Sequence, residues 1–172
     1  KSVALAFVLQ VLPQFFIGPT AGVVNDRMSR KRVLILADIG RSIVVLGMLL
    51  VQSRDLIWLL YLLLFIETTM WAFFEPGRSA IIPNIAASET ETLTANTLSS
   101  TTWSFNLAFG ATVGGFVAVW FGRDTVFLLN SVSFLFSALL LRRMRFDEPH
   151  TRTSAPFRAR DLADFSPILE GV

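Results

Sequence analysis

The chain has 172 residues, of which 53% are hydrophobic and only 16% are charged, whereas soluble domains usually contain about 25% charged residues. Its mean hydropathy is +0.59, and its 16 phenylalanines and 4 tryptophans exceed what a soluble fold of this size can hide from water. The sequence holds no cysteine and a single histidine, which excludes disulfides, thiolate zinc sites and a cysteine nucleophile. It predicts no metal site and no cofactor.

Five segments are long and apolar enough to cross a membrane, since about 20 apolar residues in a helix span a hydrocarbon core of about 30 Å. They cover approximately residues 2–24, 33–52, 56–75, 97–121 and 125–141. Backbone polar groups in lipid must pair within their own segment, so we expect each of these to be a helix. The sequence therefore predicts an all-α, polytopic membrane helical bundle over residues 1–141.

Basic residues gather at the predicted membrane edges. Four lie in residues 27–32 and six in residues 142–160. Because basic loops mark the cytoplasmic side, we expect the loop 25–32 and the C-terminal tail to be cytoplasmic. Charges at membrane edges also argue against a nucleic-acid partner, despite a sequence pI of about 9.7.

The same orientation puts Lys1 outside the cell. A chain that starts outside without a signal peptide predicts at least one further helix upstream, so we expect a fragment of a longer protein. Residues 142–172 are predicted to be a cytoplasmic linker followed by the start of an amphipathic segment. His150 lies in this polar tail, where a solvated side chain is the expected role.

The stretch "GVVNDRMSRKRVLI" (22–35) resembles the pattern G-x-L-A-D-R-x-G-R-R-x-x-x-L/I, which marks the cytoplasmic loop between the second and third helices of major facilitator superfamily transporters. The matching residues are Gly22, Asp26, Arg27, Arg30, Lys31 and Ile35, while Val24, Asn25 and Ser29 depart from the pattern.

Three further stretches carry the resemblance. "FFEPGRSAIIPNIAASETETLTANTLSS" and "FLLNSVSFLFSALLLRR" resemble the branch that contains enterobactin exporters and macrolide efflux proteins, and "FGATVGGFV" is similar to the fifth-helix antiporter motif, with Ala111 in place of its proline. The resemblance covers nearly all of residues 2–145. It implies helices two to six of a twelve-helix transporter, whose first helix and C-terminal half would be partners outside this chain.

The resemblance also implies a conformational latch on the cytoplasmic side. Its residues would be Gly22, Asp26, Arg27, Arg30 and Lys31, joined by Glu75 and Arg78 at the inner end of the fourth helix. We expect Glu75 to pair with Arg30, and Arg78 with Asp26. The alternatives are that the loop charges only set topology and that Glu75 and Arg78 pair with each other along one helix.

Three charged residues lie away from the ends of the predicted spans, where a charge costs about 2.5–3.5 kcal/mol unless it is paired or faces water. Asp38 and Arg41 are spaced to pair with each other, either as a structural pair or in gating. Glu67 has no basic residue within a helical turn, and an unpaired carboxylate in low dielectric favours its protonated form. Proton coupling, contact with a cationic substrate, a partner on the missing helix and a structural role all remain open for Glu67.

Polar and small residues in the spans are candidates for a cavity lining or for helix packing. Trp103 and Asn106 are expected at a cavity, and Asn130 either there or bonded to a neighbouring helix. Gly110, Gly114 and Gly115 have the spacing that lets helices approach closely in lipid.

No nucleotide-binding or nucleophile–base motif is present, so the sequence does not predict an enzyme. The resemblance implies a secondary active transporter. By resemblance it would be a proton-coupled exporter of small amphipathic molecules such as drugs, macrolides or siderophores, in the bacterial inner membrane. An importer or lipid flippase on the same scaffold is one alternative. A non-transporting membrane scaffold or sensor with a cytoplasmic partner is the other.

Overall fold

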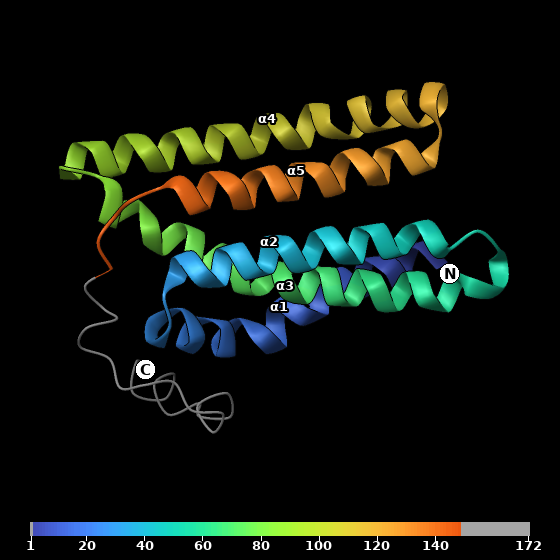
Figure 1. The fold of residues 1–172 in the computed structure, drawn as a ribbon, viewed down its shortest axis with the longest axis horizontal. Helices are drawn as coiled ribbons and strands as arrows, with labels where there is room; N and C mark the ends of the chain where they lie inside the picture. The colour runs from blue at the N-terminus through green and yellow to red at the C-terminus, as the bar shows by residue number, and fades with distance from the viewer. Residues whose placement is uncertain (1, 149–172) are drawn as a thin grey trace.

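The computed structural model describes residues 2–148, and in this range the chain forms long helices and two short 3₁₀ turns. The elements are α1 (Ser2–Arg27), α2 (Arg30–Gly47), η1 (Met48–Leu50), η2 (Arg54–Leu56), α3 (Ile57–Ile85), α4 (Glu89–Phe121) and α5 (Arg123–Arg143). The predicted all-α fold is confirmed. The helices run back and forth, so that the start of α2, the end of α3 and the end of α5 lie at one end of the bundle (Figure 1).

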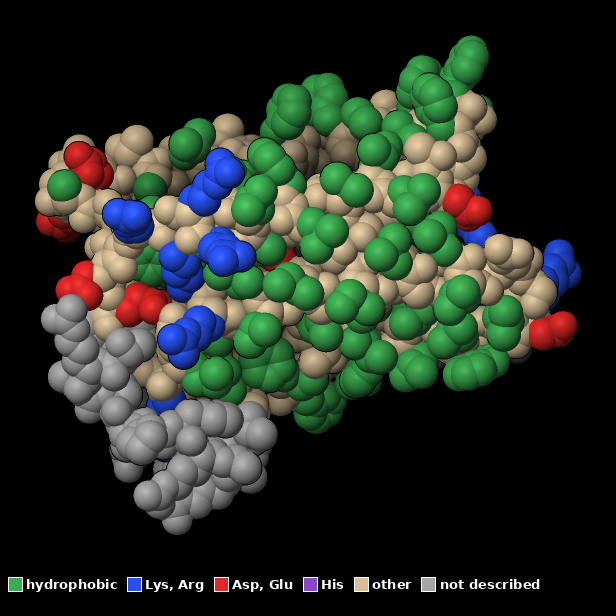
Figure 2. All heavy atoms as spheres, in the orientation of Figure 1, with side chains coloured by type: hydrophobic (Ala, Val, Ile, Leu, Met, Phe, Trp, Pro, Cys, Tyr) green, Lys and Arg blue, Asp and Glu red, His purple; other side chains and the backbone are tan. Residues whose placement is uncertain are grey.

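Four helical segments of the described range are long and apolar enough to cross a membrane. They are Arg30–Leu50, Arg54–Ile85, Glu89–Phe121 and Arg123–Arg143. α1 has 26 residues, and its crossing stays a prediction. Hydrophobic side chains are spread along the face shown in Figure 2, whereas basic side chains cluster toward the end that holds the α1–α2 loop. Exposed apolar sides and charged ends are what a lipid environment requires.

The helices pack side by side in the order α1, α3, α2, α5 and α4. α2 is the central element, because it packs on both α3 and α5. A buried hydrogen bond of 2.7 Å joins the hydroxyls of Ser42 in α2 and Ser131 in α5. Close approaches occur at Gly40, which faces Met70, and at Gly47, which faces Leu63. The packing between α2 and α3 thus depends on glycines in α2.

Helices α3 and α4 extend beyond the predicted spans 56–75 and 97–121. α3 continues through Pro76 to Ile85, and α4 begins at Glu89. The start of α4 is a capping box: the Ser88 hydroxyl accepts from the Glu91 N–H at 3.2 Å, and the Glu91 carboxylate accepts from the Ala87 N–H at 2.7 Å. The predicted spans are shorter than these helices because polar and charged residues lower the hydropathy beside them. Such residues mark a membrane edge, but a helix can continue past it.

The last part of α3 bends toward the start of α4 (Figure 1), while Ile81 stays packed against Leu34 of α2. Pro76 is the expected cause of the bend because its ring displaces the preceding turn. Asn25, which is 2% exposed, donates through Nδ2 to the carbonyl oxygens of Ala21 at 2.8 Å and Phe73 at 2.9 Å. Its Oδ1 occupies the place where a Cβ on Gly77 would lie. The end of α1 is therefore fitted against the bend in α3, and Gly77 leaves the space for it.

This fit predicts that the effect of Gly77→Ala on stability changes sign when Asn25 is replaced by alanine. Gly77→Ala should destabilise the wild-type protein, because the new methyl group displaces Asn25. In an Asn25→Ala background the space is free, and the same substitution should stabilise by about 0.5–1 kcal/mol, the helix preference of alanine over glycine. Thermal unfolding of the full-length protein in detergent measures both effects.

Gly114→Ala is the matched control, since a Cβ at Gly114 meets nothing within 4 Å. Its effect should be the same in both backgrounds. An equal effect of Gly77→Ala with and without Asn25 would show that the two residues do not share this space.

Candidate functional site: a buried charge cluster beside a cavity

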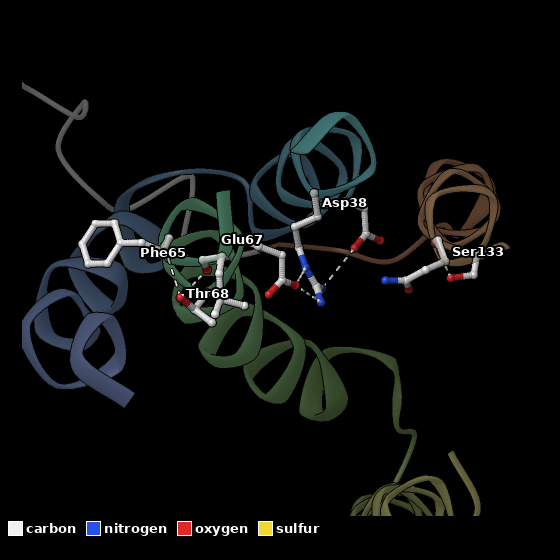
Figure 3. A network of polar contacts seen from close by, with 8 residues as sticks. Asp38, Phe65, Glu67, Thr68 and Ser133 are labelled. Atoms are coloured by element: carbon white, nitrogen blue, oxygen red, sulfur yellow. Dashed lines mark hydrogen bonds and ion pairs between the residues drawn. The ribbon is translucent and has the colours of Figure 1, made fainter. Parts of the chain in front are cut away.

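The guanidinium group of Arg41 lies between two carboxylates in the interior of the bundle. Its Nε donates to Glu67 Oε1 at 2.9 Å, and Nη2 lies 2.9 Å from the same oxygen. Its Nη1 lies 3.7 Å from Asp38 Oδ1, one helical turn earlier in α2. The side chains of Asp38, Arg41 and Glu67 are 1%, 10% and 19% exposed. Figure 3 shows this guanidinium between Glu67 of α3 and Asp38 of α2.

The predicted residues Asp38, Arg41 and Glu67 are thus brought together. Asp38 and Arg41 pair as expected, but the expectation that Glu67 lacks a basic partner was wrong. Its partner comes from the neighbouring helix α2, which spacing within α3 could not reveal. Two carboxylates share one guanidinium, so the cluster carries one excess negative charge when neither carboxylate is protonated.

Three aromatic rings surround the same guanidinium. Arg41 Cζ lies 4.0 Å from the ring centroid of Phe134 in α5, 5.0 Å from that of Trp71 and 5.8 Å from that of Phe74, both in α3. Trp71 and Phe74 are stacked on each other, with centroids 5.9 Å apart. Each ring face can attract the cation, with a strength of about 0.5–2 kcal/mol depending on desolvation. Arg41 therefore joins α2, α3 and α5.

A cavity of about 550 Å³ opens beside this cluster, between the bent end of α3, the first half of α4 and the end of α5. Trp71 and Phe74 form part of its wall, so these two rings lie between the cavity and Arg41. Trp103 and Asn106 of α4 line it as well, as their sequence context predicted. The lining is mainly apolar, and Arg78 adds a charged group at one side. Such a surface suits an amphipathic molecule.

The predicted cross-pairs of the latch residues are not formed. Glu75 pairs with Arg78, one helical turn away, at 2.7 Å, and Arg78 Nη1 also donates to the Ser99 hydroxyl at 2.7 Å. Arg30 donates to the Ala80 carbonyl oxygen at 3.0 Å and lies 3.5 Å from Asp26. The pairing of Glu75 with Arg30, and of Arg78 with Asp26, was therefore wrong for this conformation. The bend in α3 directs Glu75 and Arg78 toward α4.

The loop after α1 is instead fastened to the segment that follows α5. Lys31 Nζ donates to the carbonyl oxygens of Arg142 at 3.0 Å and Met144 at 2.6 Å, at the end of α5. Glu148 accepts from the Ser29 hydroxyl at 2.6 Å and from the Lys31 backbone N–H at 3.1 Å, at the start of α2. A cation thus meets one helix C-terminus and an anion meets another helix N-terminus, as the helix dipoles favour.

Other predicted residues have less defined surroundings. Asn130 is exposed and its side chain makes no hydrogen bond to another described helix; Ser131, its neighbour, makes that contact instead. A Cβ at Gly22, Gly110, Gly114 or Gly115 would meet nothing within 4 Å, so close packing at these glycines is not seen among the described helices. Arg27 is the last residue of α1. The predicted tail segment and His150 lie outside the described residues.

Two residues with a defined role were not predicted. Asn25 had only been counted as a departure from the loop pattern, although a buried amide at a helix end next to a proline bend is a recognisable partner for free carbonyl groups. Phe134 lies on α5 among several apolar residues, and nothing in its local sequence distinguishes the ring that faces Arg41.

A bundle of long apolar helices with a charge cluster in its interior is the architecture of a polytopic membrane protein. The family model of the Major Facilitator Superfamily matches residues 1–170. The chain therefore belongs to this superfamily, and the resemblance drawn from the loop pattern is confirmed.

Several relatives carry transporter names. The chain is 30% identical to the uncharacterized MFS-type transporter YfiS of Bacillus subtilis over 130 residues, which are 76% of this chain and 30% of that protein. It is 32% identical to the multi-drug resistance efflux pump PmrA of Streptococcus pneumoniae over 137 residues, 80% of this chain and 33% of the pump. It is 28% identical to the putative bacilysin exporter BacE of Bacillus subtilis over 138 residues, 80% of this chain and 34% of the exporter.

The chain thus spans about a third of the length of these relatives. No solved structure matches it. Since the family and the relatives are transporters, the prediction that the chain is not an enzyme is confirmed, as is its place among multi-pass membrane proteins.

The cluster predicts that Arg41 is needed for folding as long as its two carboxylates are present. Arg41→Met leaves two buried carboxylates without a cation and should destabilise by about 3–5 kcal/mol. Adding Asp38→Asn and Glu67→Gln removes both charges and should restore most of the stability. The yield and unfolding temperature of the full-length protein in detergent measure this.

Arg54→Met is the control, because Arg54 is exposed and near the turn between α2 and α3. It should have little effect. If Arg41→Met were as stable as the wild-type protein, the cluster would not stabilise the packing of α2 on α3.

Proposed function

We propose that the chain is part of a secondary active transporter that exports small amphipathic molecules in exchange for protons. The observation that carries the proposal is the buried cluster in which Asp38 and Glu67 share the single cation of Arg41. One proton neutralises this cluster, so its charge state can follow the proton gradient. The printed names of the relatives, an efflux pump and an exporter, support the outward direction.

The cluster has the properties of a two-state element. With both carboxylates charged, Arg41 is held from both sides; after protonation of either one, it retains a single anionic partner. Because Asp38 lies on α2 and Glu67 on α3, a change in this pairing alters the attraction between the two helices. A proton then shifts the balance between two conformations, to the extent that it binds them with different affinity.

We further propose that the substrate binds in the cavity beside the cluster and is released by alternating access, in which one half of the transporter rocks against the other. The first helix and the second half would come from sequence beyond this chain. Asp26, which is 74% exposed, and its neighbours in the α1–α2 loop would contact that half on the cytoplasmic side of the bacterial inner membrane. A scaffold or sensor would not need a cavity next to a buried excess charge.

Glu67→Gln leaves Asp38 and Arg41 as a one-to-one ion pair without the excess negative charge, so transport should lose its dependence on the proton gradient. Cells that make the full-length wild-type protein should accumulate less ethidium, and a protonophore should raise the accumulation. Cells with Glu67→Gln should resemble cells without the protein. The measurement is ethidium fluorescence, with the amount of protein in the membrane determined in parallel.

Glu89→Gln changes an exposed carboxylate in the first turn of α4 and should behave as wild type. If the Glu67→Gln variant still exported ethidium in a protonophore-sensitive way, the cluster would not be the site of proton coupling. Equal ethidium in all strains would count against export of cationic dyes and favour an importer, a flippase or a non-transporting role.

The proposed orientation is tested by single cysteines, since the chain contains none. Ser53→Cys and Thr90→Cys both change exposed residues, at opposite ends of the bundle. A membrane-impermeant maleimide should label Ser53→Cys in intact cells and Thr90→Cys only after permeabilisation. The reverse pattern would place the basic α1–α2 loop outside.

A further inference from the structure

Among the described side chains, only Trp71 and the neighbouring Phe74 both face Arg41 and line the cavity. The ring centroid of Trp71 lies 5.0 Å from Arg41 Cζ, and the indole also forms part of the cavity wall. Trp103 lines the cavity without a ring contact to Arg41. Phe134 lies 4.0 Å from Arg41 Cζ and is not in the cavity wall. The two functions of the site, binding and charge pairing, therefore meet at the Trp71–Phe74 stack.

We infer that Trp71 is a positioning residue that transmits substrate binding in the cavity to the Asp38–Arg41–Glu67 cluster. The inference rests on the proposed function and adds the residue through which its two parts are coupled. We expect a substrate that packs on the cavity side of the indole to displace the stack, because the Trp71 and Phe74 rings lie in contact, with centroids 5.9 Å apart and an interplanar angle of 16°. The guanidinium then loses or gains a ring face, which changes how firmly it holds the two carboxylates.

The surroundings of the cluster contain few other groups that titrate. Besides Glu67, the titratable residues of α3 are Tyr61 near its start and the Glu75–Arg78 pair near the cavity rim. α5 faces Arg41 with Phe134, and its charged residues lie only at its two ends. The charged residues of the described part of α1 lie at its end, in Asp26 and Arg27. A pH-dependent signal at Trp71 is therefore expected to report on the cluster itself.

The first experiment needs no substrate. The tryptophan fluorescence of the purified full-length protein is measured as a function of pH. The pH-dependent part should vanish in Trp71→Phe and in Glu67→Gln, and it should persist in Trp103→Phe. Loss of the signal in Trp103→Phe, or its persistence in Trp71→Phe or Glu67→Gln, would overturn the inference.

The second experiment separates binding from coupling, with ethidium as the probe in vesicles that contain the full-length protein. Trp103→Leu should raise KM and leave the pH profile of the rate unchanged. Phe134→Leu should shift the pH profile by about 0.5 pH unit, the size expected for one cation–π contact, with KM unchanged. Trp71→Leu should change both, and Trp71→Phe should restore both in large part.

A Trp71→Leu variant that changes KM alone, as Trp103→Leu does, would show that the indole only lines the cavity. Failure of the wild-type protein to transport ethidium would count against the proposed function for this dye. In that case the fluorescence result still decides whether Trp71 is linked to the cluster.

Discussion

A guanidinium group inside an apolar bundle has to be neutralised by the residues around it, since lipid and packed side chains offer no water to do so. Arg41 meets this requirement with a partner on its own helix, a partner on α3 and a ring on α5. The central position of α2 follows from these contacts together with the buried hydroxyl pair of Ser42 and Ser131. Arg41 and the Ser42–Ser131 bond thus add directional contacts to the apolar packing of the three helices, and these contacts help to fix their relative rotation.

α4 shows the opposite situation. It has no buried residue and packs chiefly along α5, and the bend of α3 at Pro76 carries the end of α3 toward its first half. The cavity is the space left between these three helices, and the pair Glu75–Arg78 with Ser99 closes one side of it. The same part of α3 also contacts α1, because the Asn25 amide donates to the Phe73 carbonyl oxygen just before the proline.

Hydropathy was sufficient to predict the all-helical fold, because lipid leaves few alternatives for a long apolar segment. The order in which the helices pack was not predicted. The helix ends were not predicted, because the charged residues after Phe74 and before Leu98 lower the hydropathy although α3 and α4 continue through them. The capping box at Ser88 is a sequence signal that indicates the true start of α4. For the site, the local pair Asp38–Arg41 followed from spacing. The contact of Arg41 with Glu67 did not, because it depends on the rotation of α2 against α3, which nothing local encodes.

The start and the middle of α2 differ in the kind of charge pairs that they make. At its start, Lys31 and Glu148 bind backbone carbonyl and N–H groups, whose charges are fixed by the helices themselves. At its middle, Asp38 and Glu67 of α3 share the one cation of Arg41; under the proposed proton coupling, a single proton changes this balance. A conformational change driven by protons is therefore expected to originate at the level of Arg41. The fastened loop between α1 and α2 would then follow the movement of its helices as a rigid connection.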